Sequence, residues 1–278
     1  MPGLLRAEVR KIVSTRLWWA LLIPVSLLTV SINLFGGVVG MGLGDVGGDR
    51  SPVLLASLAY ALGLAGVFAA VHGIVSAAGE FRHGTITTTY LTAGGRGRVL
   101  VAKMATAGMV GVGYAATAVL LGLVAGLIGQ GEARPPATGA LATVAGTGVL
   151  VCLLWSVIGV ALGTMVSNQV AALVVGLVYI LVGENVLSVV LTSGGDRLAE
   201  PSAFGRLTAY LPVNAGDIAL YDLPARELAG EQFGGLVVEQ LVGVAAPPPG
   251  WVALLVLAVW AGAAAATGWM VGSRRDVT

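Results

Sequence analysis

A compact charged segment between two long apolar runs carries the residue types most suited to contact a partner. It consists of Glu80-Phe81-Arg82-His83-Gly84-Thr85, followed by Arg96, Arg98 and Lys103. The runs on either side, residues 53–78 and 104–130, contain no Asp, Glu, Lys or Arg. If both runs cross a membrane, the charged segment between them must lie at a water interface. Its carboxylate, guanidinium and phenyl groups then predict a contact with a soluble partner.

The composition of the chain indicates an integral membrane protein. Of the 278 residues, 56% are hydrophobic and only 10% are charged, and the mean hydropathy is +0.91. A soluble domain carries about 25% charged residues. The net charge of +1 gives no field that would attract nucleic acid, so we expect no nucleic-acid partner. Cys152 is the only cysteine, which excludes a disulfide within the chain and a multi-cysteine zinc site.

The hydropathy pattern predicts an all-α membrane protein with six transmembrane helices. Crossing the hydrocarbon core takes about 20 apolar residues. One apolar run, 137–191, is too long for a single crossing, and we divide it at the polar residues Ser167-Asn168-Gln169. The six predicted spans are Leu17–Met41, Val53–Ala78, Val99–Gly129, Ala137–Met165, Val170–Leu191 and Trp251–Gly272. They form one transmembrane domain over residues 1–278.

The loop charges predict the orientation of these spans. With both termini inside, ten of the fifteen Lys and Arg residues lie on the cytoplasmic side and five outside, and ten acidic residues lie outside. This asymmetry follows the positive-inside rule, so we expect a multi-pass protein of the cell membrane with both termini cytoplasmic. The first apolar run is longer than the core of a signal peptide, and no convincing cleavage site follows it, so we expect a retained helix.

Residues 1–16 are predicted to form an amphipathic helix along the inner leaflet. Leu4, Leu5, Val9, Ile12 and Val13 share one helical face. Two interpretations stay open for this helix. It anchors the topology, or it is an elbow helix that also contacts a cytoplasmic partner through the charged residues Arg6, Glu8, Arg10 and Lys11.

The segment 192–250 is the one sizeable external stretch. It contains several prolines, and its apolar pieces Phe204–Leu211 and Phe233–Val244 are too short or too polar to span. We expect them to form re-entrant or surface helices at the outer leaflet. Asp217 and Asp222 are interpreted as solvated surface charges rather than metal ligands.

Sequence motifs for catalysis are missing. The only two lysines, Lys11 and Lys103, do not follow the Gly-x-x-x-x-Gly-Lys-Ser/Thr pattern of a phosphate-binding loop. The chain also lacks a His-Glu-x-x-His zinc motif and a Gly-x-Ser-x-Gly nucleophile turn. We therefore expect no enzyme, no catalytic residue, no metal and no cofactor bound by this chain.

Over essentially its whole length the chain resembles the permease subunits of ABC type-2 transporters, a superfamily of bacterial exporters. The resemblance rests on Glu8-Val9-Arg10-Lys11 before the first span, on Glu80–Thr85 after the second, and on Arg96, Arg98 and Lys103 at the start of the third. The external sequence Tyr210-Leu211-Pro212-Val213-Asn214-Ala215 is also similar.

This resemblance implies a half-transporter. Such permeases pair as homodimers or heterodimers in the lipid bilayer, and each binds a separate ATPase subunit that holds ATP and Mg²⁺. Residues 79–98 would contain the coupling helix that docks on the ATPase, with Glu80, Phe81, Arg82, His83, Gly84, Thr85, Arg96, Arg98 and Lys103 as coupling residues. The chain would export a hydrophobic or amphipathic substrate (drug, antibiotic, lipid or peptide) by alternating access. The plainer interpretation is that these residues only end spans and hold the topology.

Two further features leave alternatives open. Glu184, with Asn185 beside it, is the only acidic residue within a span. It lies on a substrate path, gates the exit, pairs with an arginine such as Arg206, or marks an early helix end near water.

The small-residue pairs Gly122/Gly126, Gly159/Gly163 and Gly268/Gly272 predict close helix packing. Competing functional classes are an ion-gradient-driven secondary transporter and a non-transporting scaffold or sensor subunit.

Overall fold

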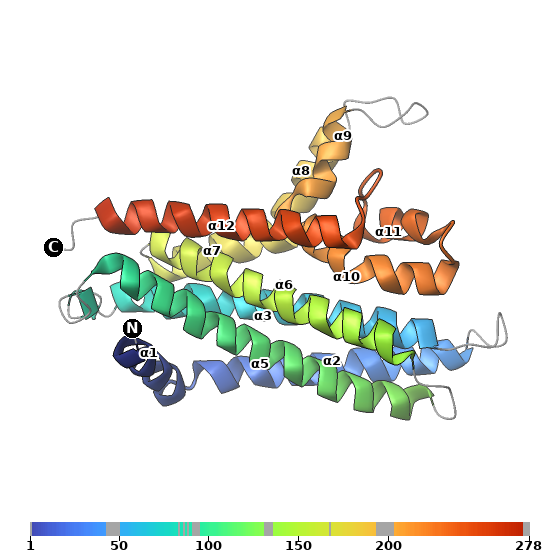
Figure 1. Ribbon diagram of the computed structural model, residues 1–278, viewed down its shortest axis with the longest axis horizontal. Helices are drawn as coiled ribbons and strands as arrows, with labels where there is room; N and C mark the ends of the chain where they lie inside the picture. Colours follow the sequence, from blue (N-terminus) through green and yellow to red (C-terminus); the bar gives the residue numbers. More distant parts are fainter. Residues whose placement is uncertain are drawn as a thin grey trace.

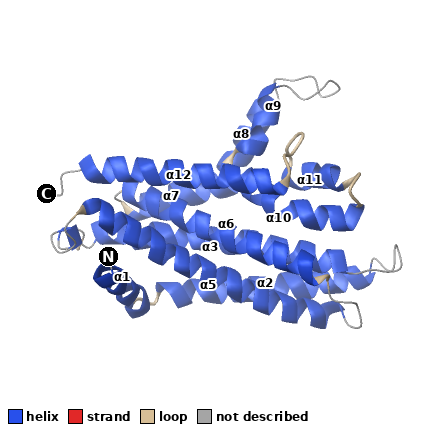
Figure 2. Ribbon diagram, in the orientation of Figure 1, coloured by secondary structure: helices blue, strands red, loops and turns tan. Residues whose placement is uncertain are grey.

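All regular structure in the part of the chain that we can describe is helical. The computed structural model describes residues 2–42, 51–82, 84–85, 87, 89–90, 95–130, 136–166, 168–192 and 203–274. Figure 2 shows that these ranges are mostly helical, with a few short described loops. Among the predicted coupling residues, His83 lies outside them.

Six helices among the described residues are long and apolar enough to cross a membrane, as predicted. They are α2 (Leu17–Gly42), α3 (Ser51–Arg82), α5 (Arg96–Gln130), α6 (Thr138–Met165), the continuous run of α7 (Gln169–Val178), a π-helix (Tyr179–Gly183) and α8 (Glu184–Thr192), and α12 (Gly250–Arg274). A shorter helix, α1 (Pro2–Ser14), precedes them. In Figure 1, α1 and the last turn of α12 lie at the same end of the bundle, which we call the termini end.

The predicted break between the fourth and fifth spans is confirmed, and its cause is a side-chain cap. Helix α6 ends at Met165, and Asn168 is the N-cap of α7. The side-chain oxygen of Asn168 accepts hydrogen bonds from the backbone N–H groups of Val170 and Ala171, at 3.0 and 3.1 Å. This cap satisfies donors that the first turn of a helix leaves unpaired.

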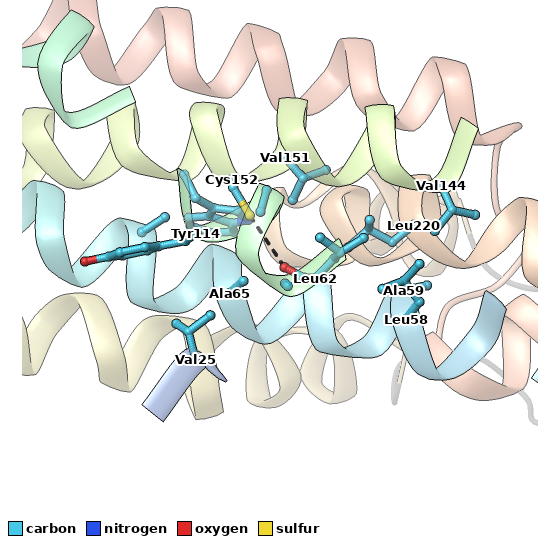
Figure 3. Packing of buried hydrophobic residues seen from close by; sticks show 14 of the residues in the cluster. Val25, Leu58, Ala59, Leu62, Ala65, Tyr114, Val144, Val151, Cys152 and Leu220 are labelled. Atoms are coloured by element: carbon cyan, nitrogen blue, oxygen red, sulfur yellow. Dashed lines mark hydrogen bonds between the residues drawn. The ribbon is translucent and has the colours of Figure 1, made fainter. Parts of the chain in front are cut away.

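Helix α3 is the centre of the hydrophobic core and packs against α2, α5, α6, α7 and α10. Leu58, Leu62 and Ala65 on its faces are almost fully buried, as is Cys152 of α6. Figure 3 shows these side chains together, with the Cys152 thiol directed at the carbonyl of Leu62, 3.6 Å away. The single cysteine therefore has a packing position in the interior.

Glycines bring α3 and α6 into backbone contact. A Cβ atom on Gly159 would lie 2.9 Å from the carbonyl carbon of Ala70, and one on Gly73 would lie 2.8 Å from the nitrogen of Val160. The other predicted small-residue pairs also lie at contacts within the chain. Gly122 and Gly126 face side chains of α2 and α3, whereas Gly268 and Gly272 face α6.

We expect Gly159→Val to disrupt this crossing severely. The new side chain overlaps the backbone of α3, which cannot yield as a flexible side chain would, so we expect a loss of about 3 kcal/mol or more in stability. The matched control is Gly146→Val in the same helix, where a Cβ meets no atom within 4 Å. Thermal unfolding in detergent measures both variants, and equal midpoints for the two would contradict the close approach.

The described part of residues 192–250 contains more helical structure than we predicted. Two expected helical pieces are found as α9 (Ala203–Leu207), extended by a 3₁₀ turn (Thr208–Tyr210), and as α11 (Gly234–Val242). Between them lies α10 (Pro212–Ala229), which packs against α3, α6, α11 and α12. Figure 1 shows α10 beside α12, whereas α8 and α9 diverge from the bundle.

The interpretation of Asp222 as a solvated surface charge is wrong. Its Oδ2 atom accepts a hydrogen bond from the backbone nitrogen of Gly250 at 3.0 Å, and its Oδ1 atom accepts one from Nε of Arg226 at 3.0 Å. Asp222 thus joins α10 to the first residue of α12, where a carboxylate is favoured by the helix dipole.

Candidate functional site

Four charged side chains from three helices meet at the termini end. Lys11 Nζ lies 2.6 Å from Oε1 of Glu8 and 2.7 Å from Oε1 of Glu80. Lys103 Nζ lies 3.1 Å from Oε2 of Glu8 and 2.6 Å from Oε1 of Glu80. Each carboxylate therefore contacts both ammonium groups, and the four formal charges cancel. We call Glu8, Lys11, Glu80 and Lys103 the ion network.

Local helix geometry explains how these residues come together. Glu8 and Lys11 lie one turn apart on α1, so their side chains share a face. Glu80 lies in the last turn of α3, and Lys103 lies two turns into α5. The network therefore contacts the two helix ends that border residues 83–95, and it binds both of them to α1.

A glycine fixes the end of α3 next to Glu80. The backbone N–H of Thr85 donates to the carbonyl of Glu80 at 3.1 Å, and that of Gly84 donates to the carbonyl of Phe81 at 3.3 Å. Gly84 has φ = +65°. This pair of bonds with a left-handed residue is the Schellman motif, which glycine adopts without steric cost.

Most of the network is buried. The exposed fraction is 4% for the Glu8 side chain, 10% for Glu80 and 6% for Lys103, whereas Lys11 is 42% exposed. Burial alone would raise the pKa of Glu8, but Lys103 and Lys11 outweigh it and hold that pKa below its usual value. Burial alone would lower the pKa of Lys11, but Glu8 and Glu80 outweigh it and raise that pKa. Glu8 and Lys11 are consequently charged at neutral pH.

One acceptor of the network has no partner in the part of the chain that we describe. Oε2 of Glu80 is buried there without a hydrogen bond. Leaving a buried acceptor unpaired costs about 1–3 kcal/mol.

We expect the docking of α1 to be insensitive to pH between about 5 and 10 and to fail in acid. The pKa of Glu8 is lowered from 4.5, so its stabilising effect is present above pH 4.5 and is lost as the pH falls through the lower, folded value. The pKa of Lys11 is raised from 10.5, so its effect is lost only as the pH rises beyond 10.5.

The fluorescence anisotropy of a label on Val13→Cys, at an exposed position of α1, measures this docking. It should stay high down to pH 5 and fall below pH 4.5. With Glu8→Gln added, the label should be mobile at every pH. An acid transition that persists in the Glu8→Gln protein would show that another group is responsible.

The remaining predicted contact residues lie around the network. Arg6 and Arg10 of α1 are exposed, as are Arg82, Gly84, Thr85 and Arg98, whereas Phe81 and Arg96 are half-buried. Arg82 Nη1 is 3.4 Å from Oε1 of Gln169 in α7. The structure thus places one group of predicted residues inside the network and leaves another group accessible at the same end.

Glu184 has a structural partner. It is 1% exposed, and its two carboxylate oxygens accept hydrogen bonds from the backbone nitrogens of Asn214 (2.6 Å) and Val213 (2.9 Å). Tyr179 Oη donates to the same carboxylate at 2.9 Å. Glu184 therefore caps the first turn of α10. The helix continues to Thr192, so the expectation of an early helix end near water is wrong.

Asn185, the other residue suggested for a substrate path, points elsewhere. Its side chain is exposed and donates to the carbonyl of Leu181, one turn earlier, at 3.3 Å. The two neighbours therefore occupy different environments, and the structure does not bring them into one site. Within the described residues, no group of three His, Cys, Asp or Glu side chains could hold a metal ion.

Neither the models of known protein families nor the curated proteins contain a match to this chain. The sequence suggested each member of the ion network, but it did not reveal that the four are in contact. One signal was available: both lysines of the chain, Lys11 and Lys103, belong to the network. Thr89, which accepts a bond from Lys11 at 3.3 Å, was missed.

Proposed function

We propose that this chain is the permease subunit of an ATP-driven exporter of the ABC type-2 class. In this proposal it works as a dimer with a second permease, and a separate ATPase subunit binds at the termini end. A hydrophobic or amphipathic substrate would leave between the two permease chains by alternating access. The cytoplasmic location of both termini belongs to the same proposal.

The observation that carries the proposal is the ion network. Residues 83–95 connect α3 to α5, and Glu80 and Lys103 lie on the two sides of this connection. Because both are paired with α1, a displacement of the connection moves three helices together rather than one. A device that converts motion of a soluble subunit into motion of membrane helices needs such a link.

Accessible groups next to the network support a docking role. Arg82 is exposed, and Phe81 is half-buried in the same helical turn. A guanidinium offers charge-assisted bonds to a partner carboxylate, and an aromatic ring is a frequent anchor of small interfaces. In this proposal Phe81 and Arg82 bind the ATPase, whereas the ion network transmits its motion to the helices. Mutations can therefore remove one role without the other.

The test is co-purification of the tagged chain with the P-loop ATPases encoded in the same genome, followed by ATP turnover in nanodiscs. The double variant Phe81→Ala, Arg82→Ala should lose capture of the ATPase. Lys11→Met should keep capture but lose the substrate-dependent part of turnover, because it weakens only the link to α1. Arg16→Met, which removes an exposed charge just after α1, should resemble the wild type.

Two results would overturn the proposal. If the wild-type chain captures no ATPase, the protein is not an ABC permease, and a gradient-driven transporter becomes the better explanation. If capture and ATP turnover occur but no solute moves in proteoliposomes, the chain is a scaffold or sensor subunit.

A further inference from the structure

We propose that a cavity at the termini end, separate from the ion network, binds an anionic phospholipid of the adjoining leaflet. The cavity has a volume of about 300 Å³ and lies between the ends of α5, α6 and α12. Its lining residues are Tyr90, Arg96, Gly97, Leu100, Thr164, Gly268, Trp269, Gly272 and Ser273. This proposal does not depend on the exporter function.

Small residues give the cavity its shape. The Trp269 ring lies directly against Gly97, where any side chain on α5 would overlap it. Gly268 and Gly272 bring α12 close to Ala161 and Thr164 of α6. The volume is at the lower end of the range for small-molecule pockets, which suits part of a lipid rather than a whole soluble ligand.

Arg96 supplies the charge. Its Nη1 atom donates to the carbonyl of Ser273 at 2.9 Å, and its guanidinium carbon lies 5.5 Å from the centre of the Tyr90 ring. These contacts hold the guanidinium at the cavity. Arg98 and Arg274 are exposed close by in sequence, and no acidic residue is among the described residues that line the cavity.

The combination of apolar lining, aromatic ring and guanidinium identifies the class of ligand. Trp269 is 49% exposed and lies in the last two turns of a membrane-length helix, where tryptophans mark the headgroup level. A basic pocket between transmembrane helices at this level suits a phosphate headgroup, while Leu100 and the Trp269 ring suit its glycerol and acyl carbons. A free inorganic anion would gain nothing from the apolar lining.

Quenching of Trp269 by brominated phospholipids tests the proposal. The purified full chain is reconstituted with brominated phosphatidylglycerol or brominated phosphatidylcholine, and the signal that disappears in Trp269→Phe is taken as that of the cavity. One arginine near a membrane surface contributes about 1 kcal/mol, so we expect about five-fold tighter binding of the anionic lipid. Native mass spectrometry of the detergent-purified protein should show the same retained lipid.

Arg96→Gln should abolish this preference, and Arg96→Lys should largely keep it. Arg98→Gln is the matched control, because it removes the same charge two residues away and outside the cavity. If Arg96→Gln and Arg98→Gln reduced the preference for the anionic lipid equally, the lipid would be attracted by general surface charge, and the proposed site would be refuted. Equal binding of the two lipids by the wild type would also refute it.

Discussion

Lys103→Met is expected to lower the free energy of unfolding by about 3–5 kcal/mol, the largest effect of any single substitution in the ion network. The Lys103 side chain is 6% exposed and contacts both carboxylates. Removing it leaves two buried negative charges that share only Lys11, whose exposed position makes it the weaker partner. The loss therefore reflects uncompensated charge more than a missing bond.

Thermal unfolding in detergent measures this change, and we expect a midpoint about 10 °C lower. Arg98→Met is the matched control from the same helix, because that side chain is exposed and should change stability by less than about 0.5 kcal/mol. The double variant Glu80→Gln, Lys103→Met restores charge balance, so it should be more stable than the sum of the two single losses predicts. Simple additivity would show that the four groups act independently.

Glu184→Ala is expected to release the start of α10 and to cost about 3 kcal/mol or more, because three donors lose one acceptor group. The donors are the backbone N–H groups of Val213 and Asn214 and the hydroxyl of Tyr179. Glu184→Gln keeps one acceptor oxygen and should lose about half as much. The loss of protection should appear in α10, 28 or more residues away along the chain, and not in α8, which contains Glu184 itself.

Maleimide labelling of Ala215→Cys reports on this release, because Ala215 is fully buried in the first turns of α10. The cysteine should be protected in the otherwise unchanged protein and should react when Glu184→Ala is added. Asn185→Ala is the neighbouring control, since that side chain is exposed and bonds only within its own helix among the described contacts. Protection that survives Glu184→Ala would refute the capping role.

The spans could be predicted from the sequence because hydropathy is a local property. Five of the six predicted spans lie within the observed helices, and the sixth, Ala137–Met165, begins at the N-cap residue of α6. Several helices extend beyond the predicted ends, as with α3, which continues through Arg82. The polar break at Asn168 was also readable, because its side chain acts on residues two and three positions later. Helix α10 was not predicted, because the sequence analysis expected helical pieces only at Phe204–Leu211 and Phe233–Val244. Pro212 in fact occupies the first turn, where proline is favoured.

Only part of the site could be predicted from the sequence, because contacts between distant residues are not a local property. The charged types at Glu8, Lys11, Glu80 and Lys103 were visible, but Glu8 and Lys103 are 95 positions apart, and their contact depends on how three helices pack. Glu184 shows the same limit. Its rarity within a span marked it as important, but its partners lie 29 and 30 residues further along the chain, on a helix that the sequence did not predict.

The glycine contacts described above restrict how two copies of this chain can associate. Because Gly159 and Gly163 are covered by α3, and Gly268 and Gly272 by α6, these ridges are not open to another subunit. A neighbouring copy would meet bulky aliphatic side chains instead, such as Val174, Val178 and Leu181 on the outer surface of α7 and the π-helix. Substitutions at those glycines should thus damage the fold of the chain itself. To test the proposed pairing of two copies, variants that separate them should be sought among the branched side chains.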